Sequence, residues 1–135
     1  CRSVSKIYLP KDYDLDILFK QVYSWKDIIN NSSYYNNYTY NKTIYLMSEE
    51  KFFDNGFLIL KESTEIGSPI GAVFFEYYEN DNTVIKSLKK YSEKIQCIVG
   101  KNIVENSVEF GNTQRPSLDD FADKINTLDF LLKLS

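Results

Sequence analysis

Two thiols and the lack of any histidine limit the chemistry that this chain can perform. Cys1 stands just before an apolar run at residues 4–10, and Cys97 lies inside another at residues 95–99. A thiolate is a strong nucleophile, and loops held by a rigid scaffold carry many catalytic groups. Without histidine, the chain can supply neither a Cys-His pair nor a histidine-ligated metal site. A general base must be a carboxylate, a lysine, an amine or a group on another segment.

Cys1 has two other interpretations besides that of a nucleophile on a connecting segment. It could be an inert thiol at a fraying end of the chain. It could also be a processed N-terminal nucleophile whose own amine is the base, but such hydrolases bury the N-terminus between two stacked antiparallel sheets. The elements expected here do not suit that architecture. Cys97 is expected to be a buried thiol that behaves as a small hydrophobe.

Alternating strands and helices are predicted along the chain. Strands are expected at residues 5–9, 57–60, 72–77 and 95–99, with a possible short one at 107–110. Helices are expected after Asp14, after Asp81 and after Ser117. Residues 32–41 could be a loop or the start of a helix that continues to residue 47, and the helix over 32–47 is the favoured interpretation. This order predicts an α/β fold with a mostly parallel sheet and helices on both faces. The expected core residues are Leu18, Val22, Ile70, Val73, Phe75, Leu88, Ile98, Phe121, Leu128 and Leu132.

Length and composition exclude several classes of protein. The 135 residues suffice for one domain but not two. A net charge of −3 with scattered lysines gives no basic face for nucleic acid. No apolar run approaches the roughly 20 residues of a membrane span. Two cysteines make no disulfide scaffold, so a reducing, cytoplasmic location is expected. The lack of an initiator Met suggests a chain that was cut from a longer one or processed.

Four collinear stretches resemble one enzyme family. The tail carries Glu109-Phe110-Gly111-Asn112-Thr113-Gln114-Arg115-Pro116 within residues 108–131. The others are residues 1–8, residues 36–47 with 54–58, and residues 68–78 with 94–99. Together they resemble the C-terminal end of acyl-CoA reductases, the relatives of the bioluminescence fatty-acyl-CoA reductases, in the aldehyde dehydrogenase superfamily. The resemblance implies an aldehyde-dehydrogenase-like catalytic domain fragment.

The resemblance implies a mechanism in which Cys1 is the catalytic residue. In this family a cysteine attacks acyl-CoA to form an acyl-enzyme, and hydride from NADPH or NADH releases the aldehyde. The family's dinucleotide-binding domain and general-base glutamate precede the cysteine, so neither is in this chain. Residues 1–135 would then be the C-terminal portion of the catalytic domain and would be inactive alone. The expected partner is acyl-CoA, and a homo-oligomer is possible. The alternative is a binding or assembly module without chemistry, in which Cys1 is incidental.

Glu65 is a second residue that the resemblance singles out. The run Glu65-Ile66-Gly67-Ser68-Pro69 is similar to the superfamily's Glu-Ile-Phe-Gly-Pro, whose glutamate holds the nicotinamide ribose. The phenylalanine is missing here, and a solvated loop glutamate is the favoured interpretation. Gln114 and Arg115 are expected to pack their loop. No metal ligands are predicted.

Overall fold

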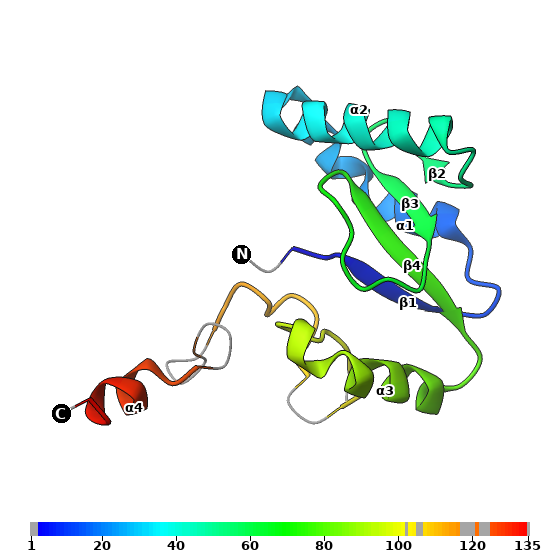
Figure 1. The fold of residues 1–135 in the computed structure, drawn as a ribbon. Coiled ribbons are helices and arrows are strands. Elements are labelled where there is room, and N and C mark those ends of the chain that lie inside the picture. Colours follow the sequence, from blue (N-terminus) through cyan, green and yellow to red (C-terminus); the bar gives the residue numbers. More distant parts are fainter. Residues whose placement is uncertain (1–2, 102, 105–106, 117–120, 122–124, 135) are drawn as a thin grey trace. The chain divides into compact units, whose positions relative to one another are not determined.

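The computed structural model describes residues 3–101, 103–104, 107–116, 121 and 125–134 (Figure 1). Cys1, the predicted nucleophile, and Ser117, the predicted cap of the last helix, lie outside these residues. The chain divides into two compact units. One is Ser3–Val84, and the other contains the residues from Ile85 onward. The sheet lies in the first unit.

A mostly parallel sheet of four strands forms the first unit, as predicted. Its strands are β1 (Lys6–Pro10), β2 (Phe53–Asp54), β3 (Ile59–Glu62) and β4 (Ala72–Tyr78). They lie in the order β1-β4-β3-β2. Strand β4 pairs in parallel with β1 and with β3, and only β2 is antiparallel to its neighbour. The predicted strand at 57–60 begins two residues later, because Asp54 to Leu58 form the turn that joins β2 to β3.

Helices cover both faces of this sheet. Successive residues of a strand point to opposite faces, and the two clusters of core side chains follow that alternation. Ile59 and Phe74 pack with buried tyrosines of α2 (Ser32–Met47). Their neighbours Leu60 and Phe75 pack instead with Leu15 of α1 (Leu15–Val22). Figure 1 shows α2 in cyan and α1 in blue against the strands. Strand β4 is therefore covered on both sides, which explains its almost continuous apolar sequence.

Side-chain caps fix where the two helices begin. Asp14 accepts a hydrogen bond of 2.9 Å from the backbone N–H of Asp16 and starts α1. Asn31 accepts one of 3.0 Å from the N–H of Tyr34 and starts α2. Between them the chain forms a 3-10 helix, η1 (Tyr23–Asn30). These caps satisfy backbone donors that have no partner inside a helix. The predicted helix over 32–47 is confirmed.

Gly71 allows α2 to approach the loop before β4 closely. Its φ is +84°, and a Cβ built there would lie 2.8 Å from the Cα of Tyr38. The amide of Asn41 donates a hydrogen bond of 3.0 Å to the carbonyl of Ile70 beside it. Only glycine combines this backbone angle with this contact. The start of β4 is therefore fixed directly to α2.

The second unit contains little regular structure among its described residues. Helix α3 (Asp81–Lys90) leads into it and is followed by η2 (Ser92–Lys94). The strand predicted at 95–99 is wrong, and so is the one at 107–110. These segments meet only at an isolated bridge between Val99 and Val108. An apolar run needs a neighbouring strand of similar length to become a strand, and here the pairing ends at Gly100.

The predicted core is correct at some positions and wrong at others. Phe75 and Leu88 are buried, whereas Ile70, Leu128 and Leu132 are exposed. Helix α4 (Thr127–Leu132) is only six residues long, and its apolar side chains face solvent. Periodic spacing indicates which side chains share a face but not whether another element covers it. The remaining expected core residues are half-buried: Leu18, Val22, Val73, Ile98 and Phe121.

Candidate functional site

The segment that follows Cys1 contacts the loop that contains Glu65. The hydroxyl of Ser5 donates a hydrogen bond of 3.1 Å to the carbonyl oxygen of Ile66. Ser5 directly precedes β1, and Ile66 lies in the loop between β3 and β4, drawn in green in Figure 1. Sixty-one positions separate the two residues in the sequence. The parallel pairing of β1 with β4 brings their segments together, because the loop ends where β4 begins.

The backbone of the loop is also held immediately before Glu65. The N–H of Ser63 donates a hydrogen bond of 3.1 Å to the carbonyl of Phe75 in β4. The Ser63 hydroxyl in turn accepts one of 3.1 Å from the N–H of Glu65. Glu65 is itself exposed, and no described residue forms an ion pair with its carboxylate. The loop thus presents a free carboxylate from a backbone that is fixed on both sides.

Lys6 is a buried charge in the same place, and the sequence analysis did not single it out. Its side chain is only 5% exposed, and its Nζ lies 2.8 Å from the Oε2 of Glu76. The Nζ also donates a hydrogen bond to the carbonyl oxygen of Ser63, and it lies 5.2 Å from the centre of the Tyr8 ring. The signal was present in the sequence, because Lys6 and Glu76 are charged residues within two apolar strands.

A second polar cluster joins α2 to the β2–β3 turn. The Tyr38 hydroxyl donates a hydrogen bond of 2.8 Å to Asp54 Oδ1, and the Lys42 Nζ lies 2.5 Å from Asp54 Oδ2. Burial acts to raise the pKa of Asp54. Hydrogen bonds from Lys42, the Gly56 backbone and Tyr38 outweigh that effect and leave the pKa lowered. Burial and the bond to Asp54 raise the pKa of Tyr38. The cluster fixes the helix to the sheet and has a structural role.

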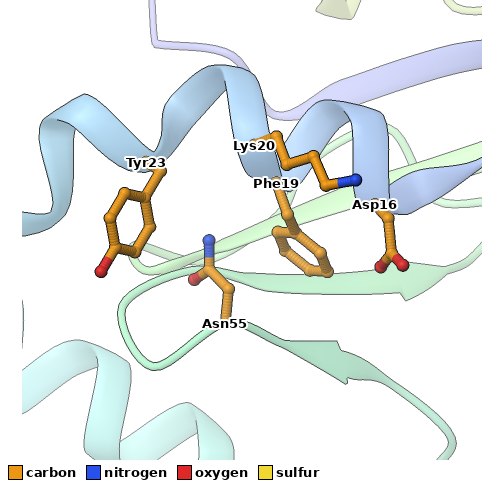
Figure 2. Close-up of a pocket in the computed structure, with 5 residues that line it drawn as sticks. All are labelled: Asp16, Phe19, Lys20, Tyr23 and Asn55. Carbon is orange, nitrogen blue, oxygen red and sulfur yellow. The ribbon is translucent and has the colours of Figure 1, made fainter.

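A shallow groove of about 290 Å³ lies along α1. Figure 2 shows its lining, which is Asp16, Phe19, Lys20, Tyr23 and Asn55. The Asn55 carbonyl oxygen accepts hydrogen bonds from the N–H groups of Phe57 and Leu58, at 3.2 and 2.9 Å. Its amide nitrogen is buried and has no partner among the described residues. None of the site residues predicted from the sequence lines this groove.

The remaining candidates lie in the second unit. Cys97 is partly exposed rather than buried and belongs to no strand, which corrects the prediction for that thiol. Its Sγ is 3.9 Å from the carbonyl oxygen of Ile98. Gln114 and Arg115 are exposed, and the Arg115 N–H donates a hydrogen bond of 3.0 Å to the carbonyl of Asn112. These contacts describe a local turn and give neither side chain a chemical role.

Within the described ranges, no group of three or more Cys, Asp or Glu side chains could hold a metal ion. No helix there is long and apolar enough to cross a bilayer. The chain matches no protein-family model, no curated protein and no solved structure.

Proposed function

We propose that this chain is the nucleophile-bearing part of an acyl-CoA reductase, which reduces acyl-CoA to an aldehyde with NADPH or NADH. One observation carries the proposal: the hydrogen bond of 3.1 Å between Ser5 and Ile66. It joins the segment after Cys1 to the loop of Glu65, the two places that the family resemblance assigns to the nucleophile and the cofactor. The parallel pairing of β1 with β4 brings these two segments together, and the proposal assigns a chemical use to that arrangement.

The number of peptide units between Cys1 and Ser5 limits how far Cys1 can lie from the Ser5 hydrogen bond to the Glu65 loop. Four peptide units separate Cys1 from Ser5 in the sequence, and a chain of that length spans at most about 14 Å. Glu65 directly precedes Ile66, the loop residue that Ser5 contacts. A nicotinamide bound beside Glu65 and an acyl group on Cys1 would need such closeness, because hydride transfer requires the reacting atoms to be about 3–3.5 Å apart.

In the proposed reaction, the Cys1 thiolate attacks the thioester carbonyl of acyl-CoA. A new carbon–sulfur bond forms, the bond to the CoA sulfur breaks, and CoA leaves as a thiolate that takes up a proton. One thioester replaces another, so the transfer has little thermodynamic cost. A reduced nicotinamide, when bound, would provide the hydride for reduction at the acyl carbon held on Cys1. The bond to the Cys1 sulfur then breaks, which releases the aldehyde and restores the thiolate.

The residues around Glu65 fit a ribose. A carboxylate accepts hydrogen bonds only, and it can take two hydroxyl donors at once. Glu65 is exposed, and Ser63 and Ile66 fix the backbone on either side of it. Its side chain can therefore meet a diol without breaking an existing ion pair. The rest of the nicotinamide nucleotide would bind to the upstream domain that the resemblance implies.

The proposal is tested by measuring aldehyde formation from acyl-CoA and NADPH with the full-length protein. Cys1→Ser is expected to abolish the reaction, and Cys97→Ser, the matched control thiol, to leave it within about twofold. The purified 135-residue chain is expected to form no aldehyde, because the family resemblance assigns the dinucleotide-binding domain to residues upstream of Cys1. Reductase activity that survives in Cys1→Ser would instead favour a module in which Cys1 is incidental.

A further inference from the structure

We propose that Lys6 is a positioning residue that holds the Glu65 loop in the geometry required for the nicotinamide ribose. The inference rests on the proposed function and adds a residue to that site. Lys6 begins β1 and is five positions from Cys1 in the sequence. It touches neither the proposed thioester nor the cofactor, and it acts through the loop backbone.

The contacts of Lys6 link the three segments that form the site. Its Nζ donates to the carbonyl of Ser63, at the start of the loop. The same Nζ pairs at 2.8 Å with Glu76, which belongs to β4. Lys6 itself pairs with Phe74 of β4 in the parallel ladder. One ammonium group therefore connects β1, β4 and the loop, and its three donors allow it to serve two acceptors at once.

Because the Lys6 side chain is buried, an uncharged side chain or water cannot easily replace its ammonium group as the donor to Ser63 and Glu76. The side chain of Lys6 is 5% exposed, so water cannot easily replace its partners. A buried ammonium is retained only where acceptors surround it. Glu76 is 33% exposed and stays partly hydrated without Lys6, whereas the Ser63 carbonyl would lose a charged donor. Loss of the amine should therefore affect the loop more than the sheet.

The hydrogen bonds beside Glu65 transmit the effect of Lys6 to that residue. Ser63 receives the bond from Lys6 at its carbonyl, and its hydroxyl accepts the bond of 3.1 Å from the Glu65 N–H. A shift of Ser63 therefore moves Glu65 directly. Ser5 holds the other side of the loop through Ile66. A small displacement of a binding group weakens the binding of its ligand, because affinity depends on the direction of the hydrogen bonds.

The chain offers a matched control for this lysine. Lys11 follows β1 and forms an ion pair with Glu79, which follows β4. This second pair joins the same two strands at their other ends, but its side chains are 62% and 73% exposed. It contacts no part of the Glu65 loop in the described structure. Lys11→Met therefore removes an equivalent cross-strand charge pair without altering the proposed site.

The test separates the two half-reactions in the full-length protein. Acylation of Cys1 is followed by mass spectrometry with acyl-CoA and no nucleotide, and aldehyde formation is followed as NADPH is varied. Lys6→Met is expected to raise the KM for NADPH about tenfold and to leave the acylation rate within about twofold. Lys6→Arg, which keeps charged donors, is expected to recover most of the loss. Lys11→Met is expected to change neither quantity.

The outcomes distinguish this inference from the proposed function. If the wild-type protein is not acylated at Cys1, the proposed function fails and the inference falls with it. If the wild type is acylated but Lys6→Met keeps the wild-type KM, only the inference is overturned. The inference is also overturned if Lys6→Met slows acylation and aldehyde formation equally and Lys6→Arg does not restore them. Should Lys6→Met fail to fold, Glu76→Gln replaces it and is expected to raise the same KM by a smaller factor.

Discussion

The hydroxyl of Ser5 donates a hydrogen bond of 3.1 Å to the carbonyl of Ile66 and so joins the start of β1 to the loop before β4. The parallel pairing of β1 with β4 makes this contact possible, because it places Ser5 beside the entry to β4. The family resemblance assigns a nucleophile to the first of these segments and a ribose ligand to the second. Their meeting is the structural basis of the proposed function.

Removal of the Ser5 hydroxyl should loosen the loop. Ser5→Ala is expected to lower the free energy of unfolding by about 0.5–1.5 kcal/mol, the net contribution of one hydrogen bond. It should also speed hydrogen exchange at the amides of the loop between β3 and β4. Thr64→Ala is the control, because Thr64 lies in the same loop and is exposed. Equal effects of the two substitutions in denaturant melts would remove the role given to Ser5.

Gly71 and Gly56 form a pair that separates steric contact from backbone strain. Both have positive φ, +84° and +93°, but only a Cβ on Gly71 would meet neighbouring atoms, at Tyr38. Alanine at either position carries the left-handed backbone penalty of about 1–2 kcal/mol. Gly71→Ala should lose about 1–3 kcal/mol more, the usual cost of overpacking. Thermal melts of equal midpoint for the two variants would contradict the close packing of α2.

The Asp54 cluster predicts a specific dependence of stability on pH. Lys42, Gly56 and Tyr38 lower the pKa of Asp54 from its ordinary value of 3.8. The unfolded chain therefore binds this proton more readily, so the contribution of Asp54 is complete above pH 3.8 and is lost as the pH falls through the folded-state pKa. Asp54→Asn should be less stable at neutral pH and should lose less stability than wild type on acidification to about pH 2. If melts show that Asp54→Asn and wild type lose the same stability on acidification, the role given to Asp54 is refuted.

Truncation to alanine should affect stability differently at Phe75 and at Leu128. Phe75 is 1% exposed and packs in the sheet, so Phe75→Ala should cost about 3–5 kcal/mol. Leu128 was predicted to be core, but it is 63% exposed. Leu128→Ala is therefore expected to change the free energy of unfolding by no more than about 0.5 kcal/mol. A loss of several kcal/mol in Leu128→Ala would mean that α4 has a packing partner.

Patterns of residue type predicted the sheet well because burial acts on both of its faces. The run of apolar residues in β4 has no polar face, and only a central strand between two layers of helices satisfies that. Asp14 likewise predicted a helix start, because caps are local interactions. In contrast, the run around Cys97 forms no strand and the helix around Leu128 is exposed within the described part of the chain, although both contain the same residue types. Whether a partner exists depends on distant segments, which local periodicity does not report.

The candidate site was predictable in part. Cys1 and Glu65 came from the family resemblance, and no local pattern indicated that their segments would meet. Lys6 and Glu76 were visible as charges in apolar strands, but their pairing depends on the register that sets Lys6 opposite Phe74 and Tyr8 opposite Glu76. Register across 70 positions follows from the packing of the whole sheet. The sequence alone therefore identified residues, and the fold was needed to join them.

Acylation of Cys1 tests the central claim most directly. Full-length protein is incubated with acyl-CoA and no reductant, and peptides are examined by mass spectrometry. The account predicts one acyl adduct on the peptide that contains Cys1, lost in Cys1→Ser and retained in Cys97→Ser. Because Cys97 is partly exposed, it serves as a comparison thiol in the same protein. An adduct on Cys97 with none on Cys1 would contradict the assignment of the nucleophile.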